Sequence, residues 1–210
     1  MAFELPAFDG RLGELLPRLI LASQSPARRR LLEERGCQLI VSPTDCDESH
    51  EGMEIAQVVE SLSLRKLQAY RDASPQHSLP VLAADTLIFQ TNSVIGKAKT
   101  RKEAFSQLRA FSGNSHEVYS GFALCLVGTY THAPIIVNGS DRASVVFNEL
   151  SDHDITTYLD TEEWIGAAGS YRVQGLGKHL ISYIDGDYST VVGLPINRIS
   201  AILEKLVKDI

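Results

Sequence analysis

One stretch, from Leu19 to Leu32, constrains the fold more than any other part of the sequence. It begins with apolar residues typical of a buried strand, continues through a polar turn and then predicts a helix. Ser25 is a favourable N-cap residue, and Pro26 falls at the first helical position, where its missing N–H costs no hydrogen bond. Gly36 lies where a residue with a left-handed backbone would end the helix. The stretch therefore predicts a strand–turn–helix unit.

The start of this helix is a candidate anion site. A helix N-terminus at the end of a strand has free N–H donors and a partial positive charge, both of which attract phosphate. Ser23 and Ser25 add hydroxyl groups, and Arg28 adds a cation one turn into the helix. An ordinary capped helix with solvated arginines explains the same residues, so this stretch alone leaves both interpretations open.

The composition argues against some classes of protein. A chain of 210 residues with 44% hydrophobic and 22% charged residues is typical of one globular domain, with room for two lobes. Its formal net charge of −6 argues against a general nucleic-acid-binding protein, and no apolar stretch has the length needed to span a membrane. Because Cys37, Cys46 and Cys125 lack metal-ligand spacing, we expect free thiols in a reducing compartment.

Residues 1–18 are expected to form an N-terminal extension that precedes a domain over 19–210. The extension is acidic in part and is interrupted by Pro6 and Pro17, so it lacks the basic start and apolar core of a signal peptide. We expect it either to drape over the domain or to be disordered, without a catalytic role. A cytoplasmic protein is the resulting expectation.

A helix expected over about 54–71 carries a lysine on its apolar face. The apolar residues recur every three or four positions, and Lys66 falls on the same stripe. A lysine there either extends along the edge of the core or points into a cleft. The preceding segment, 43–52, is acidic and includes Asp47 and Glu48. It is either solvated surface or a source of a metal-binding or catalytic carboxylate.

A nearly continuous apolar run over 81–89 predicts a strand buried on both faces, with Asp85 at its centre. An unpaired buried carboxylate is costly, so Asp85 should meet a metal, a cation or several hydrogen-bond donors. A structural aspartate bonded to nearby backbone is the alternative. Residues 91–93 predict a hairpin turn, and the returning segment would bring Lys97 towards the region of Asp85.

The order of the remaining elements predicts an α/β fold with a mixed sheet. Helices are expected over 100–111, from 151 through 159 and from about 196 to 206, and strands over 118–127, 135–147 and 180–184. The β-rich middle of the chain is expected to form a second lobe. The segment 168–177 contains three glycines and is typical of a loop whose backbone approaches a ligand.

Several short motifs occur in a specific order and spacing. They are Leu-Ala-Ser-Gln-Ser-Pro-Ala-Arg at 21–28, Asp47-Glu48, Lys66, Ala84-Asp85-Thr86, Gly96-Lys97, residues 108–113 with His116, Ala168-Gly169-Ser170-Tyr171, Gln174-Gly175 and Val192-Gly193-Leu194-Pro195. Together they resemble the Maf family of nucleoside triphosphate pyrophosphatases, also called septum-formation proteins. The resemblance extends from about Leu19 to Leu206.

The resemblance implies an elongated mixed sheet with flanking helices and two lobes around a cleft, similar to the fold of inosine triphosphate pyrophosphatases. It implies hydrolysis of a nucleoside triphosphate to the monophosphate and pyrophosphate with Mg²⁺ or Mn²⁺, and a homodimer. By position, the expected substrate-binding residues are Ser23, Ser25, Arg28 and Gln174. The expected catalytic residues are Glu48, Lys66, Asp85 and Lys97.

The chemistry implied by the resemblance places the triphosphate at the helix start, with Lys66 and Lys97 neutralising further phosphate charge. Glu48 and Asp85 are the expected metal ligands. Asp85 is also expected to orient or deprotonate the water that attacks the α-phosphorus. Pyrophosphate would then leave.

The expected base is a pyrimidine, because the branch of the family that resembles dTTP and UTP enzymes carries Ala-Asp-Thr and a glutamine, present here at 84–86 and Gln174. The branch that resembles 7-methyl-GTP enzymes has Ser-Asp-Gln and a glutamate instead, and it is the alternative. The chain departs from the pyrimidine pattern at Ala27, where arginine is usual, and at Gly166-Ala167, where Asp-Lys is usual. Ala98 also replaces the usual proline after Gly-Lys.

Two other classes of function fit parts of this pattern. One is a nucleotide-binding regulator of cell division with little turnover, and the other is a metal-dependent phosphatase that removes the terminal phosphate. Among the remaining residues, His116 is expected to make a structural hydrogen bond and Cys125 to be a core residue. Trp164 and Tyr171 either stack on a base or pack in the core.

Overall fold

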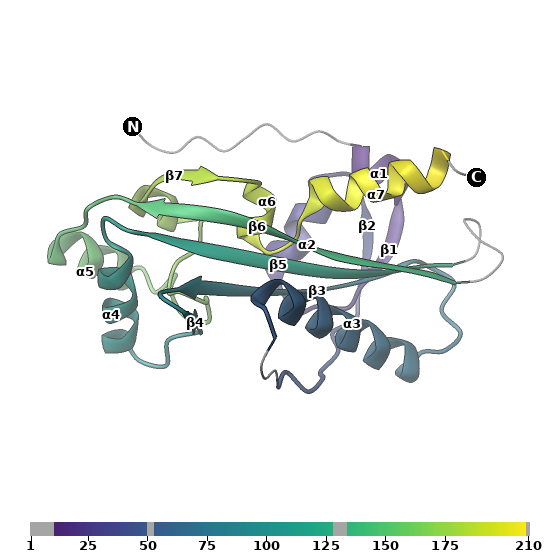
Figure 1. The fold of residues 1–210 in the computed structure, drawn as a ribbon, viewed down its shortest axis with the longest axis horizontal. Helices are drawn as coiled ribbons and strands as arrows, with labels where there is room; N and C mark the ends of the chain where they lie inside the picture. The colour runs from purple at the N-terminus through teal and green to yellow at the C-terminus, as the bar shows by residue number, and fades with distance from the viewer. Residues whose placement is uncertain (1–10, 50–52, 128–133, 209–210) are drawn as a thin grey trace. The chain divides into compact units, whose positions relative to one another are not determined.

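Seven strands form one mixed sheet in the computed structural model of the chain, which describes residues 11–49, 53–127 and 134–208 (Figure 1). The strands are β1 (Arg18–Leu21), β2 (Gln38–Val41), β3 (Val81–Gln90), β4 (Ser93–Ile95), β5 (Ser115–Leu126), β6 (Ile135–Phe147) and β7 (Ile181–Asp185). Their order is β2-β1-β3-β5-β6-β7, with β4 paired to β3. The β1–β2 and β1–β3 pairs are parallel, whereas β3–β4 and β6–β7 are antiparallel.

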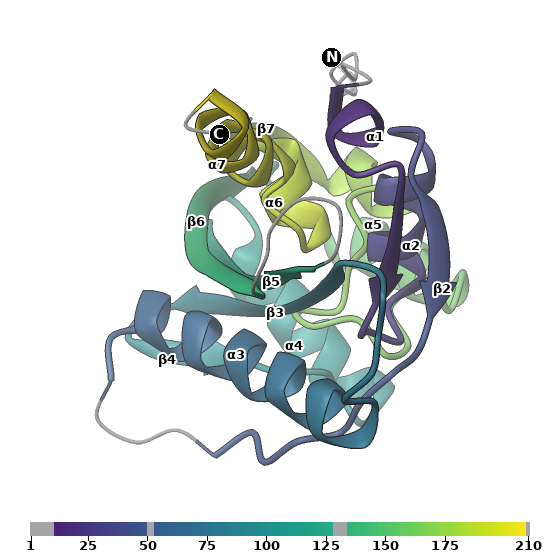
Figure 2. The same cartoon turned by 90° about the vertical axis from the view of Figure 1, so that its right-hand side faces the viewer.

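The helices are α1 (Arg11–Leu15), α2 (Pro26–Glu33), α3 (Ile55–Ala73), α4 (Arg101–Phe111), α5 (Asp152–Asp160), η2 (Leu176–Leu180), α6 (Tyr188–Val192) and α7 (Ile196–Lys208). Figure 2 shows α3 and α7 on opposite faces of the sheet. The predicted α/β class, with a mixed sheet and flanking helices, is confirmed. None of the described helices is long and apolar enough to cross a membrane.

The chain divides into two compact units, but the β-rich middle does not form one of them as expected, because Ser120–Asp141 belongs to the same unit as the N-terminal strands. Unit 1 contains Leu87–Tyr119 and Arg142–Val192. Unit 2 contains the described residues up to Thr86, Ser120–Asp141 and the described residues from Gly193 onward. Strands β3, β5 and β6 contribute residues to both units. The expected cleft stays a prediction.

Each unit has its own apolar core. In unit 1, buried residues of α4, α5, β6 and the segment that follows α5 pack around Phe111, Phe147 and Tyr171. In unit 2, apolar side chains of β1, β3, β5 and α3 form a second cluster that includes Ile20 and Tyr70. The first half of β3, Val81–Asp85, is buried, as its continuous apolar run predicts, because β3 lies between β1 and β5 in the sheet.

The predicted turns and caps are also present. Thr91 and Asn92 both have positive φ in the β3–β4 turn, which matches the right-handed twist of a two-residue hairpin. Gly36 and Gly113 have positive φ after α2 and α4. Ser151 and Asp154 form a capping box at the start of α5.

Three short helices, α1, η2 and α6, were not expected. Part of the predicted N-terminal extension forms α1, whose Leu12 is buried together with the following Leu16. The Gly13 N–H donates to Arg35 O at 2.9 Å, and a Cβ on Gly13 would lie only 2.3 Å from that oxygen, so glycine is required there. Residues 11–16 are therefore an integral part of unit 2, in contact with α7. Residues 1–10 lie outside the described residues, and the boundary at residue 19 stays a prediction.

Candidate functional site

The turn between β1 and α2 has the predicted geometry. Ser25 is the N-cap of α2, and its Oγ accepts a hydrogen bond from the Arg28 N–H at 3.3 Å. Pro26 occupies the first turn of the helix. The Ser25 N–H donates in turn to Ser23 Oγ at 3.3 Å. The two serine hydroxyls and the positive end of α2 therefore lie together, as an anion site needs.

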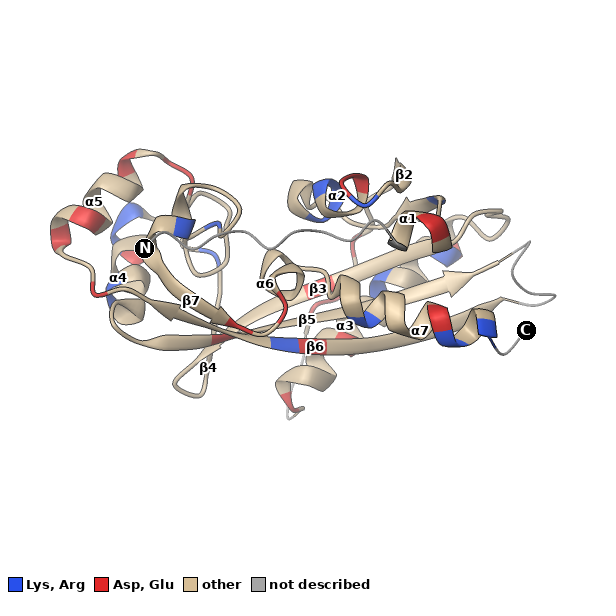
Figure 3. Ribbon diagram, turned by 90° about the horizontal axis from the view of Figure 1, so that it is seen from above, with Lys and Arg blue, Asp and Glu red and all other residues tan. Residues whose placement is uncertain are grey.

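Arg28 is held by three oxygen atoms of unit 2. Its Nε donates to Gly193 O at 2.7 Å, Nη1 to Ser23 Oγ at 3.0 Å and Nη2 to Thr86 Oγ1 at 2.9 Å. These bonds join the first turn of α2 to β3 and to the segment before α7. Arg28 is the first of three consecutive arginines in α2, where Figure 3 shows the positive charges. The guanidinium of Arg28 is thus fixed, unlike that of Arg29, which is exposed and pairs with Glu33.

The Lys66 side chain does not simply extend along the edge of the apolar core, because its ammonium group pairs with two carboxylates. Its Nζ pairs with Glu48 Oε1 at 2.8 Å and also with Asp85 Oδ1. The side chains of Lys66 and Asp85 are only 14% and 11% exposed, whereas that of Glu48 is 65% exposed. Lys66 therefore points at acidic groups, and Asp85 meets the cation that its buried position predicted.

The acidic segment before α3 is tied to that helix. Arg65 Nη1 donates to the carbonyl oxygens of Asp47 at 3.0 Å and of Ser49 at 2.6 Å. The Asp47 carboxylate accepts from the backbone N–H and the hydroxyl of Ser49. Because Arg65 and Lys66 are neighbours in α3, these bonds hold Glu48 within reach of Lys66.

Thr86 and Ser120 are polar residues of this site whose roles the sequence did not identify. Thr86 Oγ1 lies 2.8 Å from Ser120 Oγ and 3.2 Å from Gly193 O, and it also accepts from Arg28. The motif around Asp85 gave a signal for Thr86, which follows that residue directly. No local pattern marked Ser120, because its contact depends on β5 lying beside β3.

The electrostatics of this site reflect burial and close charge pairing. Burial lowers the pKa of Arg28 below its ordinary value, although the negative charges of Asp85 and Glu48 oppose the effect. Burial also acts to lower the pKa of Lys66, but the charge of Asp85 and the hydrogen bonds to Asp85 and Glu48 outweigh it and raise that pKa. Lys66 is therefore an ammonium ion at neutral pH.

The described residues contain no group of three or more His, Cys, Asp or Glu side chains that could hold a metal ion by themselves. Glu48 and Asp85 nonetheless converge on one point, the Lys66 ammonium group. Mg²⁺ in nucleotide enzymes is commonly bound by one or two carboxylates together with substrate phosphates. The donor set of Glu48 and Asp85 fits that chemistry when a phosphate completes it.

Two predicted site residues, Lys97 and Gln174, belong to unit 1. Lys97 lies beyond the β3–β4 pairing and forms an isolated antiparallel bridge with Ala168. Gln174 lies in the glycine-rich loop, and its side chain is half-buried. Their roles in substrate binding stay predictions.

The glycines of that loop approach a side chain of the protein itself. The Glu163 carboxylate accepts from the N–H groups of Leu176 and Gly177, both at 3.0 Å. A Cβ on Gly175 would lie 2.0 Å from Glu163 Oε1. These two N–H groups are therefore already bonded within unit 1, and Gly175 makes room for Glu163.

The other aromatic and thiol candidates are structural. His116 is buried, stacks on Phe111 with ring centroids 4.1 Å apart, and its Nε2 lies 2.9 Å from the Tyr171 hydroxyl, as the structural prediction requires. Trp164 is buried in the same cluster and donates from Nε1 to a backbone oxygen. Cys125 is a core residue of unit 2.

Comparison with known proteins identifies clear relatives. A family model described as "Maf-like protein" matches residues 18–206. A dTTP/UTP pyrophosphatase of Clostridium perfringens is 36% identical over 189 residues, covering 89% of this chain and 96% of the relative. Proteins of the same name from Caldicellulosiruptor bescii and Pyrococcus furiosus are both 35% identical, covering 93% and 90% of this chain and 98% and 95% of the relatives. A solved nucleoside-triphosphatase / dITP/XTP pyrophosphatase from Mycobacterium abscessus covers 91% of this chain and 97% of its own, at 14% identity and a TM-score of 0.38.

Proposed function

The chain belongs to the Maf-like protein family, and on that premise we propose that it hydrolyses nucleoside triphosphates to the nucleoside monophosphate and pyrophosphate. The observation that carries the proposal is the pairing of buried Asp85 with Lys66 and Glu48, in the same unit as the hydroxyls and N-terminus of α2. A site that only bound phosphate would need cations and N–H donors. Hydrolysis requires the two carboxylates in addition to these groups.

The triphosphate binds at the first turn of α2. Ser23 and Ser25 supply hydroxyl groups, and the positive end of the helix attracts the phosphate charge. Arg28 contributes a fixed positive charge, because its three bonds to protein oxygens prevent the guanidinium from reorienting. Fixed charges of this kind stabilise the transition state without the cost of reorganisation.

Asp85 positions the attacking water and accepts its proton as the oxygen approaches the α-phosphorus. Lys66 holds the Asp85 carboxylate in one orientation and balances part of the phosphate charge. The bond from the α-phosphorus to the bridging oxygen then breaks, and pyrophosphate leaves. Lys97 and Gln174 are proposed as further substrate contacts on the family resemblance alone.

We also propose that Mg²⁺ or Mn²⁺ is required, with Glu48 and Asp85 as its protein ligands. Both side chains present hard oxygen donors to one point in unit 2, which suits either ion. The bound ion would withdraw charge from the phosphate oxygens. The Lys66 ammonium group lies between the two carboxylates, so it must move partly out of this position when a metal ion binds.

The proposed substrates are dTTP, UTP or modified pyrimidine nucleotides, and the biological role is to remove such nucleotides from the pool. The relatives named dTTP/UTP pyrophosphatase support this choice, as does Ala84-Asp85-Thr86. Ala27 and Ala167 stand where that pattern has Arg and Lys, and Gly166 stands where it has Asp, so 7-methyl-GTP is the alternative substrate. A homodimer and a cytoplasmic location are proposed on the family resemblance alone.

A product assay tests the proposal. The protein is incubated with Mg²⁺ or Mn²⁺ and each of dTTP, UTP, CTP, 5-methyl-UTP, pseudo-UTP, ITP and 7-methyl-GTP, and pyrophosphate and orthophosphate are measured separately. We expect pyrophosphate, with the highest kcat/KM on a pyrimidine, and no turnover after chelation of the metal with EDTA. Orthophosphate as the direct product would indicate the phosphatase instead. Binding without turnover would favour a regulatory protein of cell division.

Asp85→Asn should lower kcat by about 100-fold or more, since a positioned base contributes that much. Asp72→Asn is the matched control, because Asp72 is an exposed residue at the end of α3 whose carboxylate accepts a hydrogen bond from Gln68. It should leave kcat unchanged. A kcat near that of the unchanged protein in Asp85→Asn would contradict the role of Asp85.

A further inference from the structure

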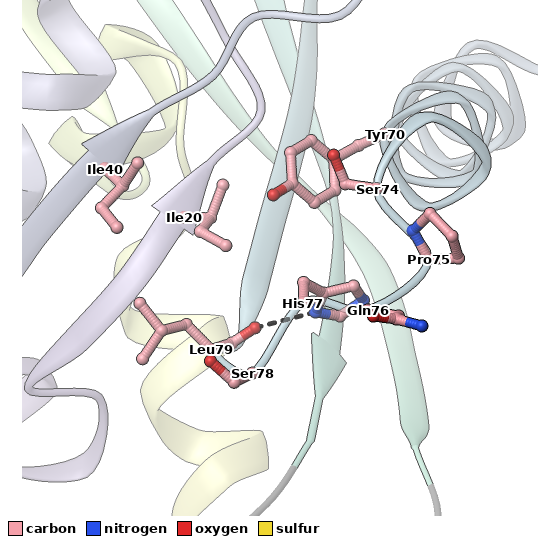
Figure 4. A pocket seen from close by; sticks show the side chains of 9 residues that line it. All are labelled: Ile20, Ile40, Tyr70, Ser74, Pro75, Gln76, His77, Ser78 and Leu79. Carbon is pink, nitrogen blue, oxygen red and sulfur yellow. Dashed lines mark hydrogen bonds between the residues drawn. The ribbon is translucent and has the colours of Figure 1, made fainter.

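A separate pocket lies in unit 2, where β1 and β2 meet the segment that follows α3 (Figure 4). Its volume is about 530 Å³, within the range of small-molecule sites. The lining residues are Ile20, Ile40, Tyr70, Ser74, Pro75, Gln76, His77, Ser78 and Leu79. None of them is a residue of the phosphate site, so this pocket is not explained by the proposed hydrolysis.

One wall of the pocket is apolar and partly open to solvent. Ile20 and Ile40 are direct partners in the parallel β1–β2 ladder, so their side chains lie on the same face of the sheet. Ile20 is buried, but Ile40 is 52% exposed because β2 is the last strand in the sheet order. Leu79 extends the same surface, as Figure 4 shows. A bound apolar group would cover this surface.

The opposite wall of the pocket contains two aromatic rings and a tyrosine hydroxyl. The Tyr70 and His77 rings meet edge to face, with centroids 5.9 Å apart. His77 Nδ1 lies 3.0 Å from Leu79 O, which fixes the orientation of that ring. Tyr70 is only 7% exposed, and its hydroxyl points into the pocket towards Ile20 (Figure 4).

The Tyr70 hydroxyl has no hydrogen-bond partner among the described residues. Its oxygen is open to the pocket, because the buried side-chain atoms without a partner among the described residues are His116 Nδ1 and Asp187 Oδ2, so a ligand can replace water at the Tyr70 hydroxyl. A hydroxyl both donates and accepts, so a ligand with either kind of group satisfies it. The Tyr70 hydroxyl is therefore a polar anchor available to a ligand in the pocket.

The charge of the lining determines the class of ligand. None of the nine lining residues is Asp, Glu, Lys or Arg. An ionic ligand would lose hydration here without gaining a counter-charge, which is strongly unfavourable. A triphosphate is excluded on this ground, whereas an uncharged ring matches the apolar wall and the two aromatic side chains.

We propose that this pocket binds an uncharged aromatic compound of one or two fused rings, whose hydrogen-bonding group pairs with the Tyr70 hydroxyl. The ring packs between Ile20 and Ile40 on one side and Tyr70 and His77 on the other. This binding is independent of the nucleotide site, and it does not rest on the proposed hydrolysis.

The test uses the full chain and two probes of matched shape, indole and the anion indole-3-carboxylate. Methyl NMR signals of Ile20, Ile40 and Leu79 are followed during titration. We expect saturable shifts with indole and an affinity at least about 10-fold weaker for the carboxylate. Absence of saturable shifts at these methyl groups, or equal affinity for both probes, would overturn the proposal.

Tyr70→Phe keeps the ring and removes the hydroxyl. It should weaken indole binding by about 5-fold, as expected for loss of one net hydrogen bond. Tyr183→Phe is the matched control, because Tyr183 is an exposed residue of β7 in unit 1, and it should bind indole unchanged. Ile40→Ser should also weaken binding. Unchanged affinity in Tyr70→Phe would refute the anchoring role.

Discussion

At the scale of single residues, Arg28 shows why the type of cation matters at the phosphate site. Its guanidinium donates to Gly193 O, Ser23 Oγ and Thr86 Oγ1 at once, from three different nitrogen atoms. A lysine has a single nitrogen on a flexible stem and cannot reproduce that planar arrangement. The charge would remain in Arg28→Lys, but its position would not.

We therefore expect Arg28→Lys to raise KM for the nucleotide by about 10-fold or more, since hydrogen bonds to charged groups contribute about 1.5–3 kcal/mol each. Steady-state kinetics on the preferred substrate measure the effect. Arg29→Lys serves as the control, because Arg29 is exposed and pairs with Glu33 of the same helix. An unchanged KM in Arg28→Lys would show that Arg28 carries only a diffuse charge.

At the scale of elements, Glu163 holds the glycine-rich loop together. Its carboxylate accepts from the N–H groups of Leu176 and Gly177, and from the Tyr158 hydroxyl at 3.2 Å. Tyr158 also accepts from the Arg172 N–H at 3.2 Å. The loop that contains Gln174 is therefore fixed at both ends by a single acidic side chain and its tyrosine partner.

Glu163→Gln should loosen this loop, because an amide offers one acceptor oxygen where the carboxylate offers two. We expect hydrogen exchange of the Leu176 and Gly177 amides to become about 10-fold faster, the effect of losing about 1.4 kcal/mol of protection. Glu162→Gln changes the same charge at a neighbouring exposed position and should not alter these rates. Equal exchange in both variants would contradict the role of Glu163.

The sequence predicted the regular elements well because their signals are local. The N-cap at Ser25, the capping box at Ser151 and the hairpin at Thr91–Asn92 depend on neighbouring residues alone. Helix α1 was missed because it has only five residues, and its stability comes from packing of Leu12 and Leu16. Tertiary contacts of this kind leave no periodic pattern in so short a segment.

The candidate site was predictable only where a residue broke a local rule. Lys66 on an apolar stripe and Asp85 in a buried strand both need a partner, and the structure pairs them with each other. Ser120 is ordinary for a strand, so its contact with Thr86 could come only from the order of strands in the sheet. The glycines of 168–177 indicated close approaches, but the sequence did not show that the Glu163 side chain makes the one at Gly175.

At the scale of the whole molecule, buried His116 makes stability depend on pH. Burial lowers its pKa to about 3, well below the ordinary value of 6.5. The unfolded chain therefore binds a proton between these two pH values that the folded chain does not. Its contribution to stability is complete above pH 6.5 and is lost progressively as the pH falls towards 3.

His116→Gln should flatten this dependence. Between pH 6 and pH 4 we expect the free energy of unfolding of the unchanged protein to fall by about 1.4 kcal/mol more per pH unit than that of the variant. Urea unfolding at several pH values measures the slope. His153→Gln, at an exposed position of α5, should keep the slope of the unchanged protein. Parallel slopes in all three proteins would contradict the account of His116.

The central claim is that water attacks the α-phosphorus of a nucleoside triphosphate at the site of Asp85 and Lys66. Hydrolysis of dTTP or UTP in H₂¹⁸O tests it most directly, with the products separated and their masses measured by mass spectrometry. Attack at the α-phosphorus places one ¹⁸O atom in the nucleoside monophosphate and none in pyrophosphate, which is the result we predict. Label in pyrophosphate, or in orthophosphate released directly from the triphosphate, would contradict the claim.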